Sequence, residues 1–264
     1  MLLLYFFSKL WYNKYGENNM LKRIKGININ YIEYGKNDAD CLVLLHGWGQ
    51  NIEMMQPIGD RMSKQYHIVI IDLPGFGNSD EPTKVWTVYD YAEALHELLK
   101  KLSINEPIII GHSFGGKISL VYASKYKVKK LVTFGSPFKK EIQQLSMKTK
   151  ILKSLKKVPG INKLEEFAKK HIGSSDYKNA SKMMRDILVD TVNLDISEDV
   201  KKISCPTLLI WGTNDEAVSI NDAYELEKLI PDAGVVEYEG CTHYAYLERL
   251  DYTITVLNAF LGGK

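Results

Sequence analysis

The stretch Pro107-Ile-Ile-Ile-Gly-His-Ser-Phe-Gly-Gly116 decides the fold, because a short apolar run ends abruptly in the pattern G-x-S-x-G. A buried strand that stops at such a pattern must turn sharply into the next element. Gly111 and Gly115 leave room for Ser113 to adopt a strained backbone conformation that exposes its hydroxyl. The stretch therefore predicts a strand, a tight turn and a helix, with a nucleophilic serine at the turn.

A serine hydroxyl attacks a carbonyl carbon only when a neighbouring base accepts its proton, so a base and an acid should follow in the chain. The apolar run Thr207-Leu-Leu-Ile-Trp211 leads to Asp215, and the run Val235-Val-Glu-Tyr238 leads to His243. Parallel strands bring their carboxyl ends to one edge of a sheet, where α/β proteins place catalytic groups. We therefore predict that Ser113, Asp215 and His243 form a catalytic triad.

A turn bracketed by glycines follows another apolar run. Cys41-Leu-Val-Leu-Leu45 leads directly into His46-Gly-Trp-Gly49. Glycines at such a turn keep the approach of an acyl carbon open. The backbone N–H groups of Trp48 and Phe114 can then point at the same oxygen, and two such donors would form an oxyanion hole.

Together these motifs resemble the α/β-hydrolase superfamily, from about Met20 to the C-terminus. The resemblance rests on His-Gly-Trp-Gly, the segment 72–80, Gly-His-Ser-Phe-Gly-Gly, Gly-Thr-Asn-Asp and the segment 241–248. The chain is similar to the small bacterial group of carboxylesterases, C–C bond hydrolases and cofactor-free haloperoxidase-like enzymes. The resemblance implies an α/β-hydrolase fold, with a mostly parallel central sheet, helices on both faces and an inserted helical cap. It also implies a serine hydrolase that needs no cofactor. The sequence contains no H-E-x-x-H motif and no paired-cysteine spacing, so no catalytic metal is expected.

The hydrophobic pattern agrees with that fold. Apolar runs at 42–45, 68–71, 108–110, 131–134 and 207–211 are separated by helical patterns, which predicts parallel β/α units. Residues 27–34 alternate apolar and polar side chains, which is typical of a half-exposed antiparallel strand at a sheet edge. Thr87 and Asp90 have the spacing of a capping box that opens a helix. Its apolar face is expected to comprise Ala94, Leu95, Leu98, Leu99 and Leu102.

The β/α alternation stops after Gly135-Ser-Pro137 and resumes near 201–206. Apolar stripes within 151–158, 164–168 and 183–188 predict three short amphipathic helices in this gap. We expect a helical cap over residues 137–198, a hydrolase core over 20–136 and 199–264, and an N-terminal extension over 1–19. In the family that the chain resembles, this insertion commonly carries substrate specificity.

The substrate pocket is expected to have aromatic walls, which suit an apolar acyl or aryl group. Arg185 is the only arginine in the predicted cap and is the candidate partner for a substrate carboxylate. The predicted pocket residues are His46, Gly47, His112, Met183, Met184, Arg185, Trp211 and Tyr244.

Charge is distributed unevenly along the chain. The net charge of +2 argues against a nucleic-acid partner. Residues 137–198 hold 13 lysines and arginines against 8 acidic residues, so the predicted cap carries +5 and the rest of the chain −3. This charge either attracts an anionic substrate, an acidic carrier protein or a phospholipid surface, or forms a solvated lysine face.

The N-terminal residues 1–7 are apolar but too short to span a bilayer, and they lack a basic leader and a cleavage site. Together with Trp11, Tyr12 and Tyr15, they form either a membrane-surface anchor or a segment packed on the body. The three cysteines, Cys41, Cys205 and Cys241, are an odd number without metal-ligand spacing, which indicates reduced thiols in a cytoplasmic enzyme.

Several alternatives accompany these assignments. The stretch Gly111 to Lys117 comes within one residue of a phosphate-binding P-loop, but Ile118 stands where a magnesium-binding hydroxyl is needed. Asp72 ends a strand near the site, but the family resemblance implies that the aspartate of this Asp-x-Pro-Gly turn holds the loop backbone by hydrogen bonds. Glu216, next to Asp215, is the alternative acid.

The function predicted from the sequence is cleavage of a small-molecule carboxylic ester or related acyl bond through an acyl-enzyme. A C–C bond hydrolase of the meta-cleavage type is the alternative enzyme. A ligand-binding protein of this fold without catalysis is the alternative from another class.

Overall fold

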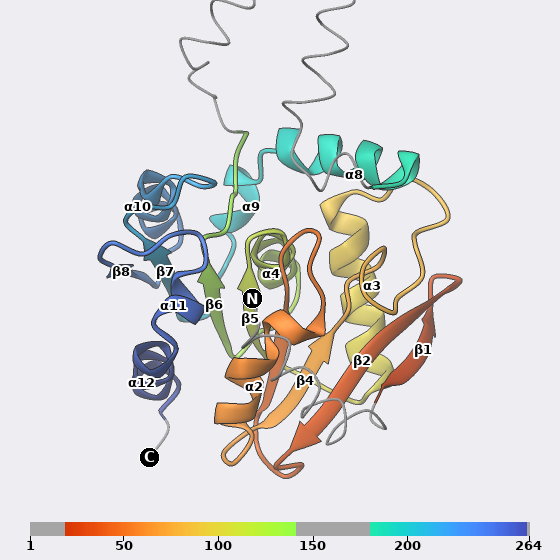
Figure 1. Cartoon of the computed structure of the whole chain (residues 1–264), viewed down its shortest axis with the longest axis horizontal. Coiled ribbons are helices and arrows are strands. Elements are labelled where there is room, and N and C mark those ends of the chain that lie inside the picture. Colours follow the sequence, from red (N-terminus) through yellow and green to blue (C-terminus); the bar gives the residue numbers. More distant parts are fainter. Residues whose placement is uncertain (1–18, 141–179, 263–264) are drawn as a thin grey trace, which may run out of the picture.

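An eight-stranded sheet runs through the computed structural model, which describes residues 19–140 and 180–262 (Figure 1). The strands lie in the order β1-β2-β4-β3-β5-β6-β7-β8. The pairs β1–β2 and β2–β4 are antiparallel, and β4, β3 and β5 to β8 are parallel. The strands are β1 Met20–Ile24, β2 Ile27–Gly35, β3 Cys41–Leu45, β4 His67–Ile71, β5 Ile108–His112, β6 Lys130–Phe134, β7 Thr207–Gly212 and β8 Ala233–Tyr238.

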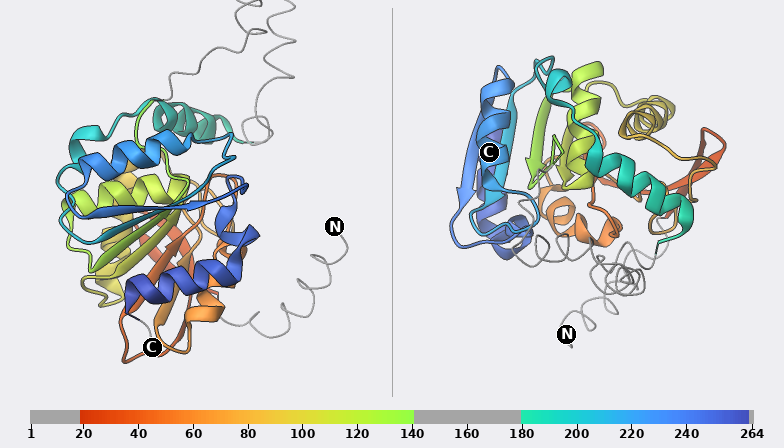
Figure 2. Two further views of the ribbon diagram at one scale, coloured as in Figure 1. Left: turned by 90° about the vertical axis from the view of Figure 1, so that its left-hand side faces the viewer. Right: turned by 90° about the horizontal axis from the view of Figure 1, so that it is seen from above.

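Helices connect these strands and cover both faces of the sheet, which confirms the predicted fold class (Figure 2). They are the 3₁₀ helix η1 Ile52–Met54 and the α-helices α2 Gln56–Met62, α3 Val88–Lys101, α4 Phe114–Lys125, α8 Lys182–Asn193, α9 Ser197–Val200, α10 Ile220–Leu229, α11 Ala245–Glu248 and α12 Leu250–Leu261.

All five apolar runs predicted as strands are strands, because each contributes side chains to two hydrophobic layers. In β3, Val43 and Leu45 face the layer formed with α3, α4 and α10, whereas Leu42 and Leu44 face the layer formed with α2 and α12. All four side chains are fully buried. Burial of one such side chain contributes about 1.5–3 kcal/mol, so the central strands are fixed between the two helix layers.

The prediction that residues 27–34 form an edge strand is wrong. β2 pairs on one side with β1 and on the other with β4, so β1 is the edge strand. A two-residue turn at Lys25 and Gly26, with φ of 47° and 86°, closes the β1–β2 hairpin. Alternation along a strand reports the exposure of its two faces, but it does not reveal whether both of its edges are hydrogen-bonded.

Helix α3 begins where the sequence predicts it. The Thr87 hydroxyl accepts a hydrogen bond from the Asp90 N–H at 3.3 Å, and the Asp90 carboxylate accepts one from the Thr87 N–H at 2.8 Å. This reciprocal pair satisfies two N–H groups that the first helical turn leaves without partners. The predicted residues from Ala94 to Leu99 are buried against the sheet.

Helix α8 crosses above the carboxyl ends of the parallel strands (Figure 1). It coincides with the third helix predicted for the cap, whereas the first two predicted helices lie outside the described residues, as do residues 1–18. Lys117, in the helix that follows Ser113, donates from its ammonium to the carbonyl oxygens of Thr191 at 2.8 Å and Leu194 at 2.6 Å. The C-terminal end of α8 is therefore tied directly to α4.

Over residues 19–140 and 180–262, the structure holds no helix whose length and apolar content suffice to cross a bilayer.

Candidate active site

Ser113 lies in a sharp turn between β5 and α4. Its φ of 51° and ψ of −110° are rare for a residue with a side chain and cost on the order of 1–3 kcal/mol. Its N–H donates to the Phe134 carbonyl at 2.9 Å, which holds the turn against β6. A Cβ at Gly115 would collide with the carbonyl groups of Leu45 and His46. The turn can therefore form only because a residue without a side chain lies beside the end of β3.

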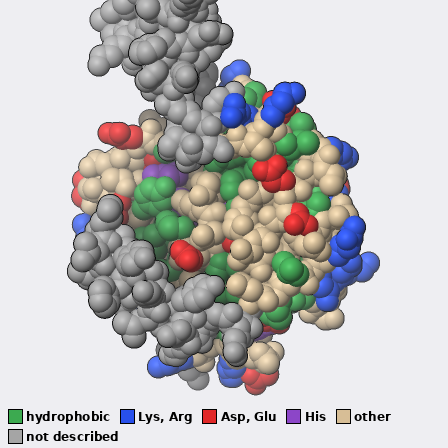
Figure 3. All heavy atoms as spheres, turned by 45° about the vertical axis from the view of Figure 1, so that its right-hand side comes forward, with side chains coloured by type: hydrophobic (Ala, Val, Ile, Leu, Met, Phe, Trp, Pro, Cys, Tyr) green, Lys and Arg blue, Asp and Glu red, His purple; other side chains and the backbone are tan. Residues whose placement is uncertain are grey.

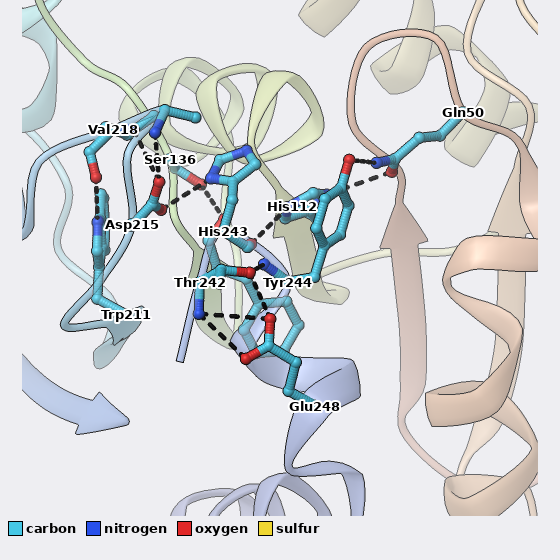
Figure 4. A network of polar contacts seen from close by, with 12 residues as sticks. Gln50, His112, Ser136, Trp211, Asp215, Val218, Thr242, His243, Tyr244 and Glu248 are labelled. Carbon is cyan, nitrogen blue, oxygen red and sulfur yellow. Dashed lines mark hydrogen bonds and ion pairs between the residues drawn. The ribbon is translucent and has the colours of Figure 1, made fainter. Parts of the chain in front are cut away.

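The side chains of Asp215 and His243 form a hydrogen-bonded pair (Figure 4). His243 Nδ1 lies 2.8 Å from Asp215 Oδ2, and the other carboxylate oxygen accepts from the N–H groups of Ala217 at 2.8 Å and Val218 at 2.9 Å. The Asp215 side chain is fully buried, while that of His243 is 15% exposed. These bonds orient the imidazole so that its Nε2 points away from the carboxylate and can accept a proton. Glu216, the alternative acid, is exposed.

Gly135, which was not among the site residues predicted from the sequence, lies against this pair. Its φ is +51°, and a Cβ there would lie 3.0 Å from both Asp215 Oδ2 and His243 Nδ1. Its sequence position could have indicated this role, because Gly135 directly follows the apolar strand run 131–134. The end of β6 thus approaches the acid–base pair at a distance that a side chain would obstruct.

The loop that carries His243 is anchored on its far side by Glu248. The Glu248 carboxylate accepts hydrogen bonds from the Thr242 N–H, at 3.1 Å, and from the Thr242 hydroxyl. These bonds hold the pKa of Glu248 below its usual value, since they favour the charged carboxylate. The residue before His243 is therefore fixed to the helix that follows it.

The buried ring of His46 supports the predicted oxyanion turn through two hydrogen bonds. The ring is fully buried, its Nε2 accepts from the Leu73 N–H at 3.0 Å, and its Nδ1 therefore donates to the Gly47 carbonyl at 2.7 Å. Burial lowers the pKa of His46 to about 4, so the ring is neutral at physiological pH. His46 supports the turn and does not reach the surface.

The two residues predicted to supply the oxyanion hole lie in the turn after β3 and at the start of α4. Neither the Trp48 N–H nor the Phe114 N–H donates a hydrogen bond within the part of the chain that the structure describes. Gly115 N–H donates to the His46 carbonyl at 3.1 Å, so the start of α4 lies directly against the turn that carries Trp48. The rings of Trp48 and Phe114 pack edge to face at 5.2 Å, and Phe76 adds a third ring 4.9 Å from Trp48.

Asp72 holds its loop, as predicted. One carboxylate oxygen accepts from the Ile52 N–H at 2.8 Å, and the other accepts from the Asn78 N–H and the Asn30 side-chain amide, both at 2.8 Å. Three donors from three segments therefore bind one buried carboxylate, so Asp72 has a structural role.

The remaining predicted pocket residues divide into buried and partly exposed groups. Trp211 is fully buried and donates from its ring to the Val218 carbonyl at 2.9 Å, beneath the loop of Asp215. His112 is also fully buried, and Met184 is buried over Gly75. Met183 and Arg185 are partly exposed, and Tyr244 is exposed. Arg185 Nε donates to the Ala180 carbonyl at 2.9 Å.

On the molecular face shown in Figure 3, hydrophobic side chains gather beside an exposed histidine.

The resemblance to a phosphate-binding loop does not extend to geometry. Gly116 packs against Ser136, where a Cβ would collide with the hydroxyl. The Lys117 ammonium, which a P-loop would direct at phosphate, donates hydrogen bonds to carbonyl groups at the C-terminal end of α8, and burial lowers its pKa to about 8.

All three cysteines are free thiols. Within the described ranges, no cluster of three or more His, Cys, Asp and Glu side chains is arranged to hold a metal ion.

Comparison with known proteins identifies relatives over most of the chain. Residues 40–153 and 143–250 match the family model described as alpha/beta hydrolase fold. Lipase 1 of Psychrobacter immobilis is 30% identical over 273 residues, which cover 92% of this chain and 84% of the lipase. The pimeloyl-[acyl-carrier protein] methyl ester esterase of Aliivibrio fischeri is 26% identical over 249 residues, covering 86% of this chain and 95% of the esterase.

The solved structure of a membrane phospholipase A superposes on this chain with a TM-score of 0.79 at 22% identity, covering 99% of this chain and 91% of the phospholipase. At that identity the superposition shows a common fold.

Proposed function

This chain belongs to the α/β-hydrolase fold family, and from that premise we propose that it is a serine hydrolase that cleaves carboxylic esters. The observation that carries the proposal is the hydrogen bond between the buried Asp215 carboxylate and His243 Nδ1, in a chain whose Ser113 occupies a strained turn after β5. The carboxylate leaves Nε2 as the free base of the ring. A strained serine and an oriented base are what nucleophilic acyl transfer requires.

In the proposed reaction, Ser113 Oγ attacks the ester carbonyl carbon while His243 Nε2 takes its proton. Asp215 keeps the imidazole in the required tautomer and offsets the positive charge that forms on it. The N–H groups of Trp48 and Phe114 bind the oxyanion, and collapse of the tetrahedral intermediate expels the alcohol with the proton from His243. Water, activated by the same imidazole, then attacks the acyl-enzyme and restores the serine.

The serine is tested by Ser113→Ala with a series of p-nitrophenyl esters from short to long acyl chains. We expect kcat to fall at least about a thousandfold while the melting temperature stays within a few degrees. Ser124→Ala is the matched control, because Ser124 lies in helix α4, which follows Ser113, and this variant should keep full activity. Ester turnover that survives Ser113→Ala would exclude the mechanism.

The relatives support an ester as the substrate class, since one is named a lipase and another a methyl ester esterase. We further propose that residues 137–198 form the cap over the site and that their net charge of +5 favours an anionic substrate, such as an ester carried on an acidic carrier protein. Turnover of such a carrier-bound ester should then fall as ionic strength rises, whereas turnover of a neutral p-nitrophenyl ester should not. Equal salt dependence for both substrates would argue against the carrier.

The same experiments separate the alternatives. Turnover of a dienol-ketone substrate without ester turnover would favour a C–C bond hydrolase. Failure of Ser113 to react with a fluorophosphonate, together with binding of an unaltered ligand, would favour a non-catalytic protein of this fold.

A further inference from the structure

Gln50 lies just after the turn that carries Trp48, and its side chain contacts two separate parts of the site (Figure 4). Its Oε1 accepts a hydrogen bond from the Gly47 N–H at 2.9 Å, while its own backbone N–H donates to the Gly47 carbonyl at 3.3 Å. Its Nε2 donates to the hydroxyl of Tyr244, 194 positions later in the chain, at 3.3 Å. Because Tyr244 directly follows His243, Gln50 connects the oxyanion turn to the loop of the base.

His112 makes a second connection between the same two segments. Its Nε2 lies 3.1 Å from the His243 carbonyl oxygen, and its Nδ1 lies 3.3 Å from Gln50 Oε1. Both of these oxygens are acceptors, and a neutral ring carries only one N–H. Gln50 Oε1 already accepts from Gly47, whereas the His243 carbonyl has no other donor among the described residues. The proton therefore belongs on Nε2, where it binds the backbone of His243.

The packing around His112 leaves it little freedom. Its ring centroid lies 4.7 Å from that of His243 and 4.9 Å from that of Tyr246, and the side chain is fully buried. A Cβ at Gly47 would come within 2.9 Å of His112 Nδ1 and 3.1 Å of Gln50 Oε1. His112 thus fills the space between the oxyanion turn and the base loop and contacts both.

The charge state of His112 suits a position beside the base. Burial, together with the nearby His243 ring, lowers the pKa of His112 to about 3, so the ring is neutral at any pH at which an esterase would work. A neutral His112 does not repel the imidazolium that forms on His243 during the attack.

From these contacts we propose that Gln50 and His112 are positioning residues that lock the oxyanion turn to the His243 loop, so that base and oxyanion donors act on the same carbonyl group. The proposal rests on the function assigned above to Ser113 and His243. Neither residue touches the substrate in this role, so their loss should lower kcat and leave KM nearly unchanged. A displacement of about 1 Å between catalytic groups can cost on the order of a hundredfold in rate.

A double-mutant cycle between Gln50 and Tyr244 tests the first connection. We expect Gln50→Met to lower kcat about ten- to a hundredfold, with KM within about twofold and a melting temperature within a few degrees of wild type. Tyr244→Phe should lower kcat about tenfold in the wild-type background but by less than about twofold when added to Gln50→Met, because both changes remove the Gln50–Tyr244 hydrogen bond. Losses that multiply in the double variant, or a Gln50→Met enzyme with wild-type kcat, would overturn the proposal.

Two substitutions at His112 test the second connection. Gln places an N–H within reach of the His243 carbonyl, whereas Leu fills similar space without a donor. We expect His112→Gln to retain at least about tenfold more kcat than His112→Leu at comparable thermal stability. Equal kcat in the two folded variants would overturn the role of His112, and if either variant does not fold, the Gln50–Tyr244 cycle decides. Glu53→Gln, an exposed residue in η1, is the control that should change nothing.

Covalent labelling distinguishes failure of this proposal from failure of the proposed function. A fluorophosphonate should label Ser113 completely in wild type and, more slowly but to the same extent, in Gln50→Met. Complete labelling at an unchanged rate in Gln50→Met would refute the positioning role alone. Absence of labelling in wild type would refute the serine hydrolase itself.

Discussion

Replacement of Asp215 by Asn should lower kcat strongly, because it moves the proton of the His243 ring from Nδ1 to Nε2. In the structure, Asp215 Oδ1 accepts from the N–H groups of Ala217 and Val218, at 2.8 and 2.9 Å. An asparagine must turn its only oxygen toward those two donors, so its NH₂ group faces His243 Nδ1. Because NH₂ donates, Nδ1 becomes the acceptor and the ring proton moves to Nε2, where it blocks proton uptake from Ser113.

The size of the effect follows from the hydrogen bonds. The opposite orientation of the asparagine amide would restore the productive tautomer, but it would leave the N–H groups of the buried Val218 and the exposed Ala217 without their acceptor, at a cost of about 1–3 kcal/mol. That cost reduces the population of the productive tautomer roughly 5- to 150-fold. Loss of the carboxylate charge beside the imidazolium adds to it, so we expect kcat to fall about 10³- to 10⁴-fold in total.

The assay is steady-state hydrolysis of p-nitrophenyl butyrate near neutral pH, with the melting temperature as a check on folding. Glu216→Gln is the matched control, since it makes the same chemical change at the exposed neighbouring residue and should leave kcat unchanged. A loss of less than about tenfold in a folded Asp215→Asn enzyme would refute the reasoning, because His243 would then keep its productive tautomer without the carboxylate.

Three further outcomes are expected. Gly135→Ala should lower kcat about tenfold or more with little change in KM, because the new methyl would lie 3.0 Å from Asp215 Oδ2 and His243 Nδ1; wild-type kcat would contradict this close approach. Asp72→Ala should lower the free energy of unfolding in urea by about 3 kcal/mol or more, since three donors lose their acceptor; a loss below about 1 kcal/mol would contradict it. Burial lowers the pKa of Lys117 to about 8, so between about pH 8 and 10.5 the unfolded chain binds this proton more readily than the folded one, and the stability of the wild type should rise with pH. Thermal unfolding should show this rise in the wild type but not in Lys117→Met. Equal pH slopes in the two proteins would argue against the buried ammonium.

Much of the fold is visible in the sequence because its signals are local. An apolar run that ends in glycine and a small polar residue specifies a buried strand and a tight turn, whatever lies elsewhere in the chain. The turn of Ser113 was predictable for this reason, whereas the hydrogen-bonding role of Asp72 was expected from the family resemblance. The capping box of Thr87 is likewise complete within four residues.

Features that depend on distant segments were not predictable. The position of β2 inside the sheet depends on β1, a short strand in which Lys22 and Arg23 conceal the strand pattern. A single glutamine in a turn carries no pattern, yet Gln50 meets a tyrosine 194 positions later in the chain. The approach of Gly135 to the acid–base pair likewise appears only when β6 and the loops after β7 and β8 are brought together.

Mapping the site of covalent modification tests the central claim most directly. The protein is treated with a fluorophosphonate, digested, and the modified peptide is identified by mass spectrometry. The account predicts one adduct per chain on Ser113, none in Ser113→Ala, and labelling at least about a hundredfold slower in His243→Ala. An adduct on a different serine, or an active enzyme that forms none, would contradict it.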